Sequence, residues 1–270
     1  MASYLLALAV YAGLTGLLAL GLNLIWGLGG MINLGLAGFY AVGAYATALL
    51  SARFGWPLGV ALVIGTLGAA VLGAGVALLT ARLRGDYLAI VTLGFAEVLR
   101  LAATNEMWLT GGSDGISNIP APGRATLTPV GFELLFLVLV WGAVLLIGAG
   151  FSRLSAAPFG RVLRAIREDE TVAQVAGKRT LRFKVQAFTL GGGASGLAGA
   201  LYAQFNAYVA PDAFQPLITP SRTAATCTGC RNGSRAPRKR VPSVSAVTST
   251  APSTAPDIRP VPPATTASTT

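Results

Sequence analysis

The chain has 270 residues, of which 53% are hydrophobic and 11% are charged, and its mean hydropathy is +0.64. A soluble globular domain carries about 25% charged residues. This composition therefore excludes that class and predicts an all-α, multi-pass membrane protein. The chain has no histidine, which removes the commonest metal ligand and general base. We expect no enzymatic activity, with no catalytic residue, no metal site and no cofactor.

The formal net charge of +10 is concentrated toward the C-terminus. Residues 1–218 hold thirteen Lys and Arg against nine Asp and Glu, whereas residues 219–270 hold seven basic residues and one acidic residue. A basic excess in the last part of the chain gives no support for nucleic-acid binding by a folded surface. We expect membrane lipid, and no nucleic acid, as a partner.

The first two predicted spans cover about residues 4–26 and 31–50, and the first charged side chain is Arg53. A cleaved signal peptide would have a basic residue ahead of a short apolar core, whereas here no Lys or Arg precedes a run long enough to cross a bilayer. A glycine-rich break separates the two spans, with Asn23 and Asn33 on either side of it. Uncharged polar groups beside broken helices line substrate paths, but they also cap helices or bond between them. Both interpretations of the two asparagines stay open.

A third span is predicted at about residues 56–80 and a fourth at about 87–103. Near the end of the fourth, Glu97 and Arg100 are three residues apart, so they lie on neighbouring positions of one helical face. Ionisable groups within a span are costly and often functional, which makes these two candidates for a translocation path. A structural ion pair at the membrane interface is the alternative, and we favour it slightly.

A polar outer loop, residues 104–130, leads to a fifth span at about 131–151. Its glycines, Gly111 and Gly112 among them, permit positive φ, and Asp114 can cap a short helix. Phosphate binding is the alternative, but no GK[ST] sequence follows. The chain has no Walker motif, so we do not expect it to hydrolyse ATP itself.

The most informative stretch lies between the fifth span and a sixth, predicted at about residues 183–208. Residues 152–182 form a basic loop, which the positive-inside rule assigns to the cytoplasm. The first half has Phe159, Val162, Leu163 and Ile166 at helical spacing, with basic side chains around them: Arg161, Arg164 and Arg167.

The second half of this loop has a helix signature of its own. Acidic residues, Glu168 and Glu170 among them, precede the segment 171–176, and Gly177 follows it. Acids at a helix start and glycine just after its end are typical of a short helix. The pair of helices either rests on anionic lipid or inserts into a cleft of a cytoplasmic partner.

Two short motifs in the remaining sequence have simpler explanations. The run 191–196 formally matches GxGxxG, but it lies inside an apolar span, where small residues four apart favour helix packing. Cys227 and Cys230 form a lone CxxC without a second pair, which is a weak signal for metal or redox chemistry. We interpret neither as a functional site.

Residues 219–270 contain no Leu, Phe, Trp, Tyr or Met and are rich in Pro, Ser and Thr. Such a segment cannot bury enough apolar surface to offset its ordering entropy, so we expect a disordered tail. If the sixth span is the last, the basic cluster of this tail lies on the outer side of the membrane, which opposes the positive-inside rule. We hypothesise that the tail is read out of frame after about residue 218, which an intact frame in the nucleotide sequence would contradict.

Lys and Arg counts also predict the orientation. The basic loop 152–182 and the loop 82–86, with two Arg, lie inside, and loop 104–130, with one Arg, lies outside. Counting back places the N-terminus outside. If the first two spans form one broken element, the N-terminus lies inside instead.

Four segments together resemble the permease subunits of branched-chain amino acid ABC importers, in their LivM-like branch. The resemblance covers about residues 15–216 and is carried by the order and spacing of these segments: 21–45, 84–93, 109–116 and 159–203.

The resemblance implies an inner-membrane subunit of a bacterial importer. Such permeases pair with a second permease, two cytoplasmic ABC ATPases and a periplasmic substrate-binding protein. It further implies that residues 170–177 dock on an ATPase and that loop 104–130 meets the binding protein. Family members continue beyond about residue 214 with a glycine-rich segment and further spans, which this chain lacks.

Three other functions stay open at this level. A urea or short-amide ABC permease has a similar sequence. A secondary transporter working alone would need no ATPase-docking segment and would show internal repeats with ion ligands at mid-membrane. A non-functional truncated membrane remnant would expose the helix faces that missing spans normally cover.

Overall fold

The computed structural model describes residues 2–80, 83, 85–122, 124 and 128–214, and in these ranges the chain is almost entirely helical. The long helices are α1 (Ala2–Leu22), α2 (Leu36–Ala52), α3 (Leu58–Thr80), α4 (Gly85–Asn105), α6 (Pro129–Ala156) and α9 (Thr180–Asn206). The shorter elements are η1 (Asn23–Leu28), α5 (Met107–Thr110), η2 (Gly112–Asp114), β1 (Ile116–Ser117), α7 (Pro158–Glu168), α8 (Glu170–Val175), β2 (Tyr208–Val209) and η3 (Pro211–Phe214).

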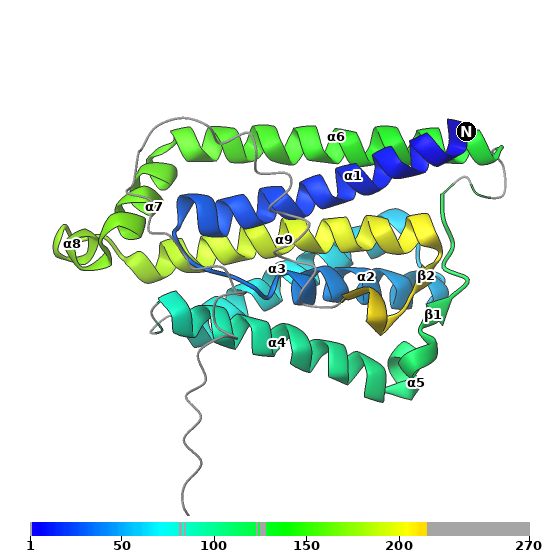
Figure 1. The fold of residues 1–270 in the computed structure, drawn as a ribbon, viewed down its shortest axis with the longest axis horizontal. Helices are drawn as coiled ribbons and strands as arrows, with labels where there is room; N and C mark the ends of the chain where they lie inside the picture. The colour runs from blue at the N-terminus through cyan, green and yellow to red at the C-terminus, as the bar shows by residue number, and fades with distance from the viewer. Residues whose placement is uncertain (1, 81–82, 84, 123, 125–127, 215–270) are drawn as a thin grey trace, which may run out of the picture. The chain divides into compact units, whose positions relative to one another are not determined.

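The all-α class and the six predicted long helices are confirmed (Figure 1). Within the described ranges, four segments are long and apolar enough to cross a membrane: Ser3–Leu28, Leu58–Thr80, Tyr87–Asn105 and Val130–Ala156. Helix α2 is shorter, at 17 residues. Helix α9 has 27 residues, but its many glycines and its polar first turns lower its hydropathy. The predicted disordered tail and change of reading frame, residues 219–270, and the CxxC pair lie outside the described residues.

Three predicted boundaries were wrong, and each has a local cause. The second span begins at Leu36 rather than at 31, because residues 29–35, here called the bend, leave the helix. Helix α6 continues to Ala156, where Pro158 starts α7. The loop predicted at 152–182 is therefore shorter, because both flanking helices extend into it.

The bend follows a π-helical turn, η1, and is fixed by side chains rather than by a helical ladder. Gly30 adopts φ +67°, a conformation that glycine tolerates best. The Asn33 Oδ1 atom accepts a hydrogen bond from the Gly35 N–H (2.8 Å), and the Leu34 N–H donates to Thr92 Oγ1 on α4 (3.2 Å). These contacts hold the bend in a non-helical conformation until α2 begins.

Helix α9 lies at the centre of the bundle and packs against α1, α2 and α3 (Figure 1). Its small residues allow backbones to touch. A Cβ on Gly199 would overlap the carbonyl oxygen of Tyr40, and one on Gly43 of α2 would overlap that of Gly196. The GxGxxG run therefore serves helix packing, as predicted.

The two ends of the bundle are different. At one end, α7 contacts η1 and α9, and α8 contacts the start of α9. At the other, β1 and β2 pair antiparallel, with Ile116 opposite Val209, beside the end of α9. The predicted outer loop and the predicted basic loop thus lie at opposite ends (Figure 1). Since α1 and η1 together form one complete span, Ser3–Leu28, the helix directions agree with an N-terminus on the side of the outer loop.

Candidate functional site

Helix α7 begins with Pro158 at its first turn, a position where proline is preorganised for a helix. Its inner face is apolar, and Leu163 and Ile166 are buried. Arg161 and Arg164 are exposed on the outer face, where Arg164 Nη2 donates to the Ser155 carbonyl (3.0 Å). The predicted amphipathic helix is therefore confirmed, with Arg161 and Arg164 on its exposed face.

Helix α8 is capped at both ends by the residue types that the sequence predicted. Asp169 Oδ1 accepts hydrogen bonds from the Thr171 hydroxyl (2.6 Å) and from the N–H groups of Thr171 (2.8 Å) and Val172 (3.3 Å). These bonds favour the carboxylate, so the pKa of Asp169 lies below its ordinary value of 3.8. Gly177 follows the helix at φ +74°.

The outward surface of α8 is apolar. Val172 is 64% exposed and Val175 is 90% exposed. Exposed apolar side chains of this size on a short helix at the end of the bundle are a candidate docking surface. We call the exposed faces of α7 and α8 the coupling surface.

Glu170, which the resemblance places in the ATPase-docking segment, makes a contact within the chain. Its Oε1 atom pairs with Lys184 Nζ of α9 at 2.6 Å. Gln174 Nε2 also donates to Thr180 Oγ1 (3.3 Å) at the start of α9. Both contacts connect α8 to α9, so Glu170 positions the helix, while about a third of its side chain stays exposed.

Arg167 also makes an internal contact. Its Nη1 atom donates to the Gly27 carbonyl at 2.6 Å, and its aliphatic stem lies against Gly30. No sequence signal could have shown this contact, because the Gly27 carbonyl lacks an intrahelical partner only where the helix ends at Leu28, and Arg167 is 140 positions away in the chain.

A cavity of about 760 Å³ separates the bend from α8. On one side it is lined by Gly29, Gly30 and Met31, and on the other by the start of α8. Lys184 and Phe188 of α9 contribute to its wall.

The four residues predicted for a translocation path occupy three environments. Asn23 is exposed on η1, whereas Asn33 is wholly buried in the bend. Asn33 Nδ2 is a buried donor with no hydrogen-bond partner among the described residues. Glu97 and Arg100 lie on α4, near its outer end. The structure does not gather all four into one site.

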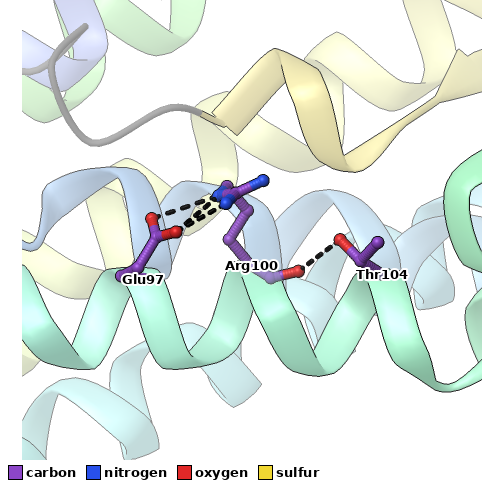
Figure 2. A network of polar contacts seen from close by, with 3 residues as sticks. All are labelled: Glu97, Arg100 and Thr104. Carbon is purple, nitrogen blue, oxygen red and sulfur yellow. Dashed lines mark hydrogen bonds and ion pairs between the residues drawn. The ribbon is translucent and has the colours of Figure 1, made fainter.

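Glu97 and Arg100 form the predicted ion pair (Figure 2). Arg100 Nη2 lies 2.5 Å from Glu97 Oε1, and Arg100 Nε donates to both carboxylate oxygens at 3.1 Å. The Thr104 hydroxyl donates to the Arg100 carbonyl one turn further along (2.9 Å). Their role in translocation stays a prediction.

The outer loop contains the predicted glycine turns. Gly111, Gly112 and Gly115 all have positive φ. Asp114 lies inside the turn η2 rather than at its N-cap, which Gly111 occupies. Its backbone carbonyl instead accepts a hydrogen bond from the Tyr208 hydroxyl (3.1 Å), which connects the loop to β2. Among the residues that the structure describes, no cluster of Cys, Asp or Glu could hold a metal ion.

Known transport permease proteins are similar in sequence to this chain. The chain is 39% identical over 222 residues to the high-affinity branched-chain amino acid transport system permease protein LivM of Escherichia coli (strain K12). It is 38% identical to the LivM of Salmonella typhimurium. Each alignment covers 73% of this chain and 52% of the relative. The probable LivM of Methanocaldococcus jannaschii is 27% identical over 76% of this chain and 68% of its own length.

The chain thus spans about half the length of its bacterial relatives. No solved structure matches it. Residues 4–232 match the family described as "Branched-chain amino acid transport system / permease component". Since this match covers most of the chain, the protein belongs to that family of permease components.

Proposed function

We propose that the chain is the membrane-spanning permease subunit of an ATP-driven ABC importer for branched-chain amino acids in the bacterial inner membrane. Its partners are a second permease, two cytoplasmic ABC ATPases and a periplasmic substrate-binding protein. The observation that carries the proposal is the coupling surface, because a stand-alone transporter has no use for exposed docking helices of this kind.

Three features of the coupling surface support docking on a protein rather than on lipid alone. The exposed apolar side chains belong to α8, whereas the arginines belong to α7. Helix α8 is short and capped at both ends. It is also held to α9 by the Glu170–Lys184 pair, so it is presented in a fixed position. Such rigid presentation lowers the entropy lost on binding a cleft.

The same reasoning assigns the other end of the bundle to the binding protein. There, Met107 and Trp108 are about 70% exposed beside the glycine turns of the outer loop. The chain contributes no covalent chemistry in this proposal. ATP hydrolysis belongs to the ATPases, whose closure moves the permease pair between outward-open and inward-open states.

The proposal is tested by recovery of the ATPases with the affinity-tagged, full-length chain. Val175→Asp places a charge on the exposed apolar face, and we expect at least about tenfold lower recovery, as for a central interface residue. Met107→Asp is the matched control, since it makes the same kind of change at the opposite end. Equal recovery with both variants would count against docking through α8.

Two further variants address the shape of α8. Glu170→Lys replaces the ion pair with Lys184 by a like-charge contact, and Gly177→Pro is incompatible with φ +74°. We expect both to reduce ATPase recovery. Substrate class is read separately, by uptake of labelled leucine and labelled urea through the assembled importer. If the assembled importer takes up urea but not leucine, the substrate is a short amide rather than a branched-chain amino acid.

A further inference from the structure

The coupling helices contact two very different parts of the bundle. Helix α8 is tied to α9, the central helix, whose glycines pack directly against the backbones of α2 and α3. Such backbone contacts leave little room for adjustment. Helix α7 also contacts α9, through the Phe159 and Phe183 rings, but it contacts the end of η1 and the bend as well. A displacement of the coupling helices therefore meets rigid packing at α9 and a more adaptable segment at the bend.

The contact between α7 and the bend has an apolar and a polar part. Leu163 belongs to the same buried cluster as Ile25, Met31 and Leu36, which come before, within and after the bend. The polar part is the hydrogen bond from Arg167 Nη1 to the Gly27 carbonyl. The stem of Arg167 fills the space beside Gly30, where a Cβ would lie 2.5 Å from its Cγ atom.

The bend has the features of a segment that can adopt a second conformation. Its backbone is held by isolated hydrogen bonds, and Gly30 permits backbone angles closed to other residues. In the described part of the chain, the fully buried Asn33 Nδ2 donor lacks an acceptor, which disfavours the present arrangement. The adjoining cavity of about 760 Å³ provides room for movement.

We propose that Arg167 is a positioning residue that transmits displacement of α7 and α8 to the bend, and that the bend is the segment whose conformation changes during transport. The inference rests on the proposed function, because the displacement is supplied by the docked ATPases. Arg167 acts through Gly27 and Gly30 and does not itself contact substrate.

The first test needs no partner. Hydrogen exchange of backbone amides is measured on the purified full-length chain in lipid nanodiscs. Arg167→Met removes the donor and keeps an aliphatic stem, and we expect exchange in residues 27–36 to rise about two- to tenfold, as for loss of one hydrogen bond. Arg153→Met, on the exposed end of α6, is the control and leaves this exchange unchanged. Arg167→Lys restores most of the protection.

The second test separates this inference from the proposed function. In the assembled importer, transport is counted for each ATP hydrolysed by the ATPases that are bound, and Arg167→Met transports several-fold less substrate for each ATP than the unmodified chain. Gly30→Ala places a Cβ against the stem of Arg167, and we expect it to lower transport per ATP in the same way. Failure of the unmodified chain to recover an ATPase would overturn the proposed function. Normal ATPase recovery with unchanged exchange in the bend and unchanged transport per ATP in Arg167→Met would overturn the role of Arg167 alone.

Discussion

Single glycines decide how closely the helices of this bundle approach. At Gly199 of α9, a Cβ would overlap the Tyr40 carbonyl oxygen and lie 3.0 Å from the Ala44 backbone nitrogen. Both are backbone atoms of α2, so a side chain cannot rotate away to make room. In lipid, where apolar side chains gain nothing by leaving the solvent, this close packing supplies much of the association between helices.

Gly199→Ala is therefore expected to destabilise the bundle by about 1–3 kcal/mol, the usual cost of overpacking. Gly68→Ala on α3 is the matched control, because a Cβ there meets nothing within 4 Å and alanine favours the helix. Thermal unfolding in detergent gives the Tm of each variant, which is compared with the Tm of the parent chain. A similar Tm for the two variants would contradict the proposed α2–α9 contact.

At the scale of elements, the cap of α8 gives the coupling surface a pH dependence. The Thr171 hydroxyl, followed by the N–H groups of Thr171 and Val172, lowers the pKa of Asp169 below 3.8. A lowered pKa in the folded state means that the contribution of Asp169 is fully present above pH 3.8. It is lost as the pH falls through the folded-state value.

We accordingly expect amide protection of α8, corrected for intrinsic exchange rates, to stay constant down to about pH 4 and to fall as the pH drops further below 3.8. Asp169→Asn keeps an oxygen acceptor for the cap without its charge, and it should remove the pH dependence. Glu168→Gln changes the neighbouring acid, which does not cap α8, and should retain it. Persistence of the pH response in Asp169→Asn would show that another group causes it.

At the scale of the whole molecule, the membrane orientation follows from where the loops lie. The outer loop and the coupling surface occupy opposite ends of the bundle (Figure 1). Both ends offer exposed positions for labelling, namely Met107, at 72% exposure, and Val175, at 90%. The positive-inside rule favours a cytoplasmic position for the basic loop, so in the proposed inner-membrane location we expect Met107 to face the periplasm.

Single-cysteine variants Met107→Cys and Val175→Cys, each in a Cys227→Ser, Cys230→Ser background, test this orientation. A membrane-impermeant maleimide should label Met107→Cys in intact spheroplasts. It should label Val175→Cys only after permeabilisation. The reverse pattern would place the coupling surface outside and would exclude docking of cytoplasmic ATPases.

Much of the fold could be predicted from the sequence, because in a membrane protein composition and periodicity reflect the environment directly. All six long helices, the amphipathic α7, the acidic start of α8 and its glycine end were predicted in this way. The Glu97–Arg100 pair was predictable because helical geometry fixes the distance between residues three apart. All these features depend on residues close together in the chain.

Only the tertiary structure decided the contacts between distant residues. The bend at residues 29–35 is held in part by the hydrogen bond from the Leu34 N–H to Thr92 of α4. The Gly27 carbonyl accepts a hydrogen bond from Arg167, 140 positions later in the chain. Glu170 likewise pairs with Lys184 only because α8 folds back onto α9. A sequence pattern indicates which side chains favour a buried position, an ion pair or a helix cap. The packing of helices far apart in the chain determines which partner each of these side chains contacts.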